Sequence, residues 1–92
     1  MEQVDGLPGA DLVKEGLADL ARGVESVPAL LVSIGAPRLR RIGLEIPKTF
    51  PSPEKRLYAL LETTGADSAH SRYNALIRRL VSYERAAECA AR

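Results

Sequence analysis

A chain of 92 residues has room for one small domain, since a chain of this size removes only about 60% of its unfolded surface from water. Hydrophobic residues make up 46% of the sequence and charged residues 27%, which is typical of globular proteins and excludes a disordered or fibrous chain. The formal net charge of +1 argues against a strongly basic nucleic-acid binder. The charge is uneven, however: acidic residues dominate 1–27, and basic residues dominate 38–56 and 70–92.

The chain lacks the signals of export and of membrane insertion. Its longest uncharged apolar run covers 27–36, far short of the roughly 20 residues that cross a bilayer. The first ten residues have neither the basic nor the apolar region of a secretory signal. The single cysteine, Cys89, has no partner for an internal disulfide or a zinc cluster. We therefore expect a cytoplasmic protein that makes no contact with a membrane.

The first predicted helix follows residues 1–9, which we expect to form a flexible tail. Asp11 is its predicted N-cap and Gly23 its predicted end. The helix should bury one apolar side and leave Asp19 on the polar side. The apolar side consists of Leu12, Val13, Gly16, Leu17, Leu20, Ala21 and Val24.

A second short helix is predicted from Ser26, which caps it, to Gly35, with Pro28 in the first turn, where no backbone N–H is needed. We expect this apolar segment to be the most buried part of the chain. Pro37 opens a third short helix, which ends at Gly43. In that helix, Leu39 and Ile42 should face the core, with Arg38 and Arg41 directed outward and Arg40 at the flank.

The segment 26–45 resembles a helix-turn-helix motif, with a short helix, a glycine turn at Gly35 and a second basic helix. The resemblance implies that Arg38, Arg40 and Arg41 contact guanine edges or phosphates. The position that usually holds the apolar residue locking the second helix falls on Arg41, and that helix is short for reading bases. A DNA-binding regulator is therefore the second of two functional hypotheses.

An extended connector follows, because three prolines stand between Pro47 and Pro53. Leu44, Ile46 and Phe50 should attach it to the core. Ser52 is the predicted N-cap of the next helix, which has Pro53 at its first position and ends at Gly65. The buried stripe of that helix consists of Leu57, Tyr58, Leu60 and Leu61.

The last helix is predicted to start at Asp67 or Ser68 and to run almost to Arg92, a length of about 36 Å. Its apolar residues follow a heptad spacing: Ala69, Tyr73, Leu76, Leu80, Tyr83, Ala87 and Ala90. Either this helix is the centre of the bundle, or its C-terminal half protrudes and pairs with a second chain. In the second arrangement Tyr83 anchors the contact and keeps its hydroxyl in water.

Glu84 falls within the apolar stripe of this helix, and a buried carboxylate needs a partner. Two alternatives remain open. Arg56 or Arg22 could pair with it inside the chain, or a second chain could supply the charge at an interface.

The predicted fold is an all-α single domain over 1–92, a small bundle of four to five helices with the long C-terminal helix as its spine. The leading function is a non-enzymatic protein-interaction module, either for an acidic partner or as a homodimer through the C-terminal helix. Its candidate interface residues are Tyr73, Leu76, Leu80, Tyr83, Glu84, Arg78, Arg79 and Arg85.

Catalytic, metal and cofactor sites are not predicted. His70 and Cys89 stand about five turns apart on one helix, so they cannot meet within a subunit. One histidine and one cysteine offer too few ligands for a metal. The glycines of "GLPGAD" follow no strand, so the phosphate-binding fingerprints are absent as well.

Overall fold

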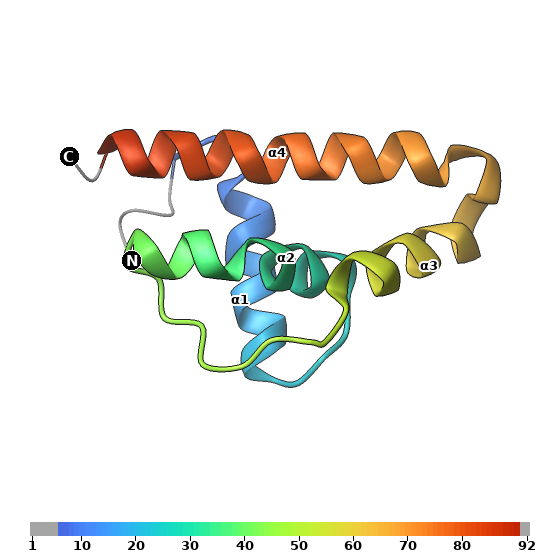
Figure 1. The fold of residues 1–92 in the computed structure, drawn as a ribbon, viewed down its shortest axis with the longest axis horizontal. Coiled ribbons are helices and arrows are strands. Elements are labelled where there is room, and N and C mark those ends of the chain that lie inside the picture. The colour runs from blue at the N-terminus through green and yellow to red at the C-terminus, as the bar shows by residue number, and fades with distance from the viewer. Residues whose placement is uncertain (1–5, 91–92) are drawn as a thin grey trace.

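The computed structural model describes residues 6–90. These form α1 (Ala10–Ala21), α2 (Val27–Arg41), α3 (Pro53–Gly65), the short 3-10 helix η1 (Ala66–Ser68) and α4 (Ala69–Ala90) (Figure 1). The part of the chain that is described contains no strand, and α4 is its longest element, so the predictions of an all-α fold and of a long C-terminal helix are confirmed.

Gly9 starts α1, and the predicted cap Asp11 lies in the first turn instead. Gly9 is in the left-handed region at φ 77°, which favours glycine. A Cβ at this position would stand 2.7 Å from the carbonyl oxygen of Arg79, so the missing side chain lets α1 begin directly against α4. Leu7, within the predicted tail, packs against the core. The remainder of that predicted tail, 1–5, lies outside the described residues.

The turn after α1 is organised by Asp19, which is buried although we expected it on the polar side. Its carboxylate accepts hydrogen bonds from Ser26 Oγ at 2.6 Å and from the Arg22 guanidinium. These hydrogen bonds lower the pKa of Asp19. The helix ends where predicted, with Gly23 at φ 71°, but Val24 is exposed rather than buried. A polar network therefore sets the path from α1 to α2.

α2 is one continuous helix where we predicted two. Its N-cap is confirmed, since Ser26 Oγ accepts a hydrogen bond from the backbone N–H of Ala29 at 3.2 Å. The helix then runs through Gly35 and Pro37 to Arg41. A proline inside a helix costs about 3 kcal/mol, and burial of the surrounding residues offsets this cost. The separate third helix predicted from Pro37 to Gly43, and the turn of a helix-turn-helix, are corrected accordingly: the described residues form four α-helices and one short 3-10 helix.

α2, rather than α4, is the central helix of the domain. As predicted, its first half is deeply buried, and it packs against α1, α3 and α4. Its buried residues are Ala29, Leu30, Leu31, Val32, Ser33, Gly35, Ala36 and Leu39. Gly35 lies against Leu80 and Glu84, while Arg38 reaches Glu84 and Glu88 one turn further along. α2 and α4 thus run in the same direction, and the described part of α4 does not protrude (Figure 1).

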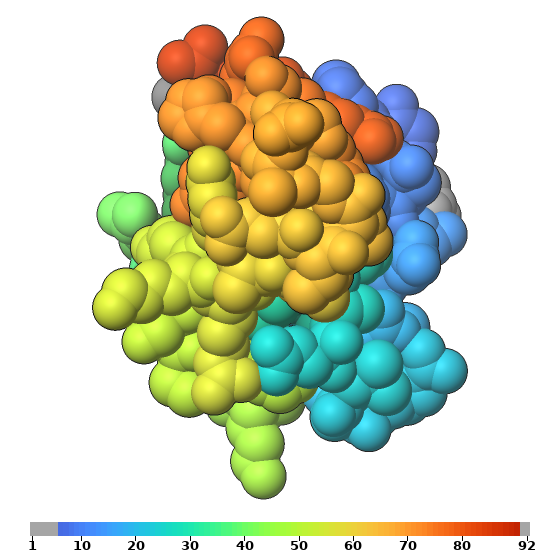
Figure 2. Space-filling model, turned by 90° about the vertical axis from the view of Figure 1, so that its right-hand side faces the viewer, coloured from blue at the N-terminus to red at the C-terminus, as the bar shows by residue number. Residues whose placement is uncertain are grey.

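The connector between α2 and α3 is attached to the core as expected. Leu44 and Ile46 are buried, and the backbone N–H of Phe50 donates a hydrogen bond to Ser33 Oγ at 3.2 Å. Ser52 precedes α3 but makes no side-chain cap, because its backbone is left-handed at φ 47°. After Gly65 the chain turns through η1, and the start of α4 lies directly above the end of α3 (Figure 2).

Candidate functional site

One face of α4 is exposed along its whole described length. Its residues are spaced alternately by four and three positions, which places them in one line along a helix. We call this line the outer α4 face, and it consists of Ser71, Ala75, Arg78, Ser82, Arg85 and Cys89. Helical geometry places this line opposite Leu80 and Glu84, which lie against Gly35 of α2, and all six of its residues are exposed.

Arg78 and Arg85 give the outer α4 face a positive charge. Neither guanidinium makes an ion pair or a hydrogen bond with another described residue. They are two turns apart, a distance of about 10.5 Å along the helix axis. The two carboxylates of α4, on Glu84 and Glu88, point toward Arg38 on α2. The charges of α4 are therefore segregated, with the anionic groups inward and the cationic groups outward.

Arg79, another predicted interface residue, lies beside this face and forms an ion pair with Asp11 of α1. Its Nη2 atom is 3.0 Å from Asp11 Oδ1, and the two side chains are 49% and 75% exposed. An ion pair so exposed contributes at most about 1 kcal/mol. Arg79 can therefore exchange Asp11 for an external carboxylate at little cost.

The apolar members of the predicted interface belong instead to the core of this chain. Leu80 and Tyr83 are buried, and Tyr73 and Leu76 are half-buried against the body. The ring of Tyr73 packs on that of Tyr58, with 5.7 Å between centroids. The Tyr83 hydroxyl is buried and, among described residues, has no hydrogen-bond partner, so the prediction that water solvates it is wrong. These side chains attach α4 to α2 and α3.

Glu84 is buried, as predicted, but its partner is neither of the arginines that we expected. Its Oε1 atom lies 3.4 Å from Nη1 of Arg38, which also binds Glu88 through two hydrogen bonds of 2.6 and 2.8 Å. Arg56 pairs with Glu25 and Arg22 pairs with Asp19. Arg38 was expected to point outward. The continuous α2 brings it alongside α4 instead, so the charge of Glu84 is balanced within the chain.

Burial raises the pKa of Glu84, Arg38 lowers it, and Glu88 raises it further, so that the net direction is upward. The folded state then binds a proton at Glu84 more readily than the unfolded state does. Ionised Glu84 therefore lowers the free energy of unfolding. This destabilisation is absent below the ordinary pKa of glutamate and is fully present above the raised pKa of Glu84. Asp19 acts in the opposite direction, since its lowered pKa stabilises the fold above its ordinary value.

We expect Glu84→Gln to gain stability relative to the natural protein as the pH rises through the raised pKa of Glu84. The variant removes the ionisable group and leaves Arg38 bound to Glu88. Urea unfolding at a series of pH values from 4 to 8 measures the difference. Glu62→Gln, at an exposed position of α3, is the control and should show no such trend. A difference in the free energy of unfolding that is constant across this pH range would contradict the raised pKa of Glu84.

The three arginines of the predicted DNA-contacting helix do not form a common surface. Arg38 is engaged by Glu84 and Glu88. Arg40 donates two hydrogen bonds, of 2.8 and 2.6 Å, to the carbonyl oxygen of Ile46. Arg41 alone of the three is exposed without a partner among the described residues. Two of the three guanidinium groups therefore bind other residues of this chain.

His70 and Cys89 lie exposed toward opposite ends of α4, as predicted. The Nε2 atom of His70 is 3.2 Å from the side-chain nitrogen of Asn74. Within residues 6–90, no group of three or more histidine, cysteine or acidic side chains could hold a metal ion. None of the helices in this range combines the length and the apolar character needed to cross a bilayer.

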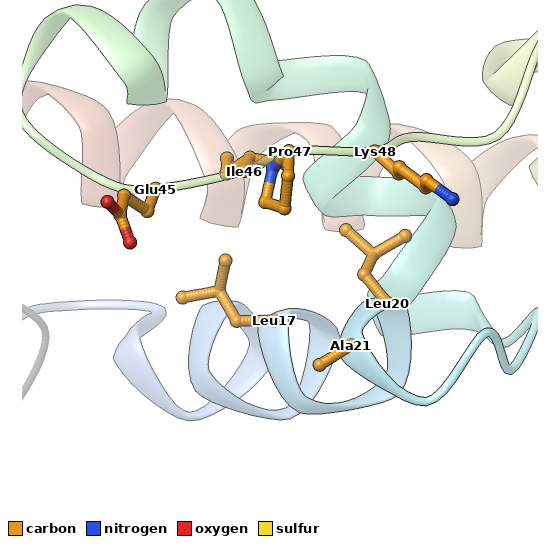
Figure 3. Close-up of a pocket in the computed structure, with 7 residues that line it drawn as sticks. All are labelled: Leu17, Leu20, Ala21, Glu45, Ile46, Pro47 and Lys48. Carbon is orange, nitrogen blue, oxygen red and sulfur yellow. The ribbon is translucent and has the colours of Figure 1, made fainter.

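A cavity of about 370 Å³ opens between α1 and the connector (Figure 3). Its lining residues are Leu17, Leu20 and Ala21 from α1 and Glu45, Ile46, Pro47 and Lys48 from the connector. The sequence indicated that both segments are partly apolar. Nothing in the sequence indicated that a gap would remain between the two segments, because this gap depends on how the rest of the chain positions the connector. Sequence reasoning therefore missed this site.

The outer α4 face and the cavity are two candidate sites on the described part of the chain. Comparison of the chain with protein-family models, with curated proteins and with solved structures gives no match.

Proposed function

We propose that this protein is a non-enzymatic interaction module that binds an acidic segment of another protein on the outer α4 face. One observation carries the proposal: Arg78 and Arg85 are exposed on one line of the helix and have no partner among residues 6–90, while both carboxylates of α4 are turned toward Arg38. Arginine is well suited to such contacts, because its planar guanidinium can bind a carboxylate through two hydrogen bonds. Arg79 can join the contact by releasing Asp11.

An acidic protein segment fits this face better than a second copy of the chain. Two outer α4 faces brought together would place like charges in contact, which is unfavourable. The apolar side chains suggested for a homodimer, Leu80 and Tyr83, are already used in the core.

Duplex DNA fits the face less well than an acidic segment does. Among the described residues, Arg78 and Arg85 are the two arginines of this face without a partner, and a duplex binder usually makes more contacts with phosphates than two arginines supply.

Fluorescence anisotropy with a labelled peptide of about twelve glutamate and alanine residues tests the proposal. Exposed pairs contribute up to about 1 kcal/mol each, so the double variant Arg78→Ala/Arg85→Ala should weaken binding by about five- to tenfold. The matched control is Arg41→Ala/Lys55→Ala, which removes the same charge from exposed positions on α2 and α3 that have no partner among described residues. The control should bind the peptide nearly as well as the natural protein.

Three outcomes would contradict the proposal. Equal losses of affinity for the peptide in the two double variants would mean that net charge alone attracts the peptide. Tighter binding of a 20-base-pair duplex than of the peptide, lost in Arg78→Ala/Arg85→Ala, would favour the DNA hypothesis. The third outcome is a molecular mass, measured by sedimentation velocity, that doubles for the natural protein as its concentration rises but stays at the monomer mass for the Arg78→Glu variant. This result would assign the face to a homodimer.

A further inference from the structure

We infer that two copies of this chain associate about a two-fold axis through the surface around the cavity between α1 and the connector. We call this surface, formed by the lining residues named above, the cavity face. It includes the C-terminal half of α1, whereas the start of α1 contacts α4, where Gly9 lies against Arg79. The cavity face and the outer α4 face share no residue, so this inference is independent of the proposed function.

The centre of the cavity face is apolar and open to water. Leu17 and Leu20 are only half-buried on α1, and Ala21 and Pro47 are exposed (Figure 3). Val24, three residues after Ala21, is 42% exposed as well. Removal of such surface from water is the main favourable term in most protein association, so the centre of this face gains from being covered.

Charges of opposite sign stand at the two ends of the cavity face. The side chain of Glu45 leaves the end beside Leu17, and that of Lys48 leaves the opposite end, beside Leu20 (Figure 3). Both residues are exposed, and neither makes an ion pair or a hydrogen bond with another described residue. A partner with a single charge would pair with only one end. A partner that carries both charges in the reverse order would pair with both ends.

A second copy of the chain is such a partner. A two-fold axis through the centre of the face brings each end of one copy against the opposite end of the other, which is the arrangement of most homodimers. Glu45 of each copy then meets the partner's Lys48, and both charge pairs form together. A lysine can lay its aliphatic stem on an apolar surface and keep its ammonium group in water, so the partner's Lys48 can reach Glu45 across Leu17. The net charge of +1 opposes this association only weakly.

The connector that carries both charged residues is held in place within each copy. Arg40 donates hydrogen bonds of 2.8 and 2.6 Å to the carbonyl oxygen of Ile46, which stands between Glu45 and Lys48 in the sequence. The side chain of Ile46 is itself buried, at 4% exposed. The separation of the two charges is therefore set before the copies meet, which reduces the conformational entropy lost on association.

Exchange of the two charges tests this inference by sedimentation equilibrium. The natural protein should pass from monomer to dimer as its concentration rises to about 1 mM. Glu45→Lys and Lys48→Glu should each weaken the dimer by about tenfold or more, because both attractions become repulsions. The double variant Glu45→Lys/Lys48→Glu should recover the natural affinity, since each new lysine again meets a glutamate of the partner. An equimolar mixture of the two single variants should form a heterodimer for the same reason.

Control variants separate this surface from the rest of the chain. Glu62→Lys and Lys55→Glu make the same charge changes at exposed positions of α3 and should leave the dimer unchanged. Arg78→Glu, on the outer α4 face, should also leave it unchanged. Ala21→Lys places a charge at the apolar centre and should abolish the dimer, whereas Ala59→Lys, exposed on α3, should not. Far-UV circular dichroism verifies that each variant is folded.

Three results would overturn the inference. The first is a natural protein that stays monomeric up to about 1 mM. The second is a double variant that associates no better than Glu45→Lys or Lys48→Glu alone, because the two charges would then not face each other across the axis. The third is a dimer that Arg78→Glu dissociates, because the contact would then lie on the outer α4 face.

Discussion

Gly16→Ala should lower the free energy of unfolding by about 1–3 kcal/mol, although alanine is the better helix former. The Cβ that this change adds would stand 2.4 Å from the carbonyl oxygen of Pro28 and 2.5 Å from Cγ2 of Val32. The carbonyl belongs to the backbone of α2 and cannot rotate away, so α1 and α2 must separate. Urea or thermal unfolding measures this loss of stability. Each kcal/mol should lower Tm by about 4–8 °C.

Ala18→Gly is the matched control for this prediction, because Ala18 is exposed on the same helix. It should cost about 0.5–1 kcal/mol through backbone entropy alone. On helix propensity alone, Gly16→Ala would stabilise the protein by a similar amount. A more stable Gly16→Ala variant would therefore contradict the close contact between α1 and α2.

Leu39→Ala should lower the free energy of unfolding by about 2–5 kcal/mol, the usual cost of a cavity at a fully buried leucine. Leu39 is 0% exposed in the last turns of α2, within the segment that the sequence suggested as a DNA-contacting helix. Arg41→Ala, two residues further along and exposed, should change stability by less than about 0.5 kcal/mol. Urea unfolding of the two variants measures this contrast.

This contrast also tests the packing of the last turns of α2. If residues 37–41 lay at the surface, they could move without disturbing the core, and Leu39→Ala would cost little more than Arg41→Ala. Similar small losses in both variants would thus contradict the burial of Leu39 in the core. A large loss at Leu39 alone is the result that we expect, since this side chain belongs to the core cluster formed with α3 and α4.

Features that depend on neighbours within a few residues could be predicted from the sequence. Ser26 caps α2 because its side chain needs only to reach the N–H three residues later. Gly23 ends α1 because the chain there needs a positive φ. Among the site residues, the exposure of Arg78 and Arg85 followed from helical periodicity alone. The all-α class and the long C-terminal helix are sums of such local preferences.

Features that depend on distant parts of the chain come from packing and could not be predicted from the sequence. The helix continues through Pro37 because its flanks are buried by three other helices. Glu84 finds Arg38, 46 residues earlier in the chain, because α2 and α4 run in the same direction. The cavity lies between α1 and a connector that Arg40 of α2 binds at the carbonyl oxygen of Ile46. Local propensities amount to a few tenths of a kcal/mol per residue, whereas burial of an apolar side chain contributes about 1.5–3 kcal/mol, so packing prevailed wherever the two disagreed.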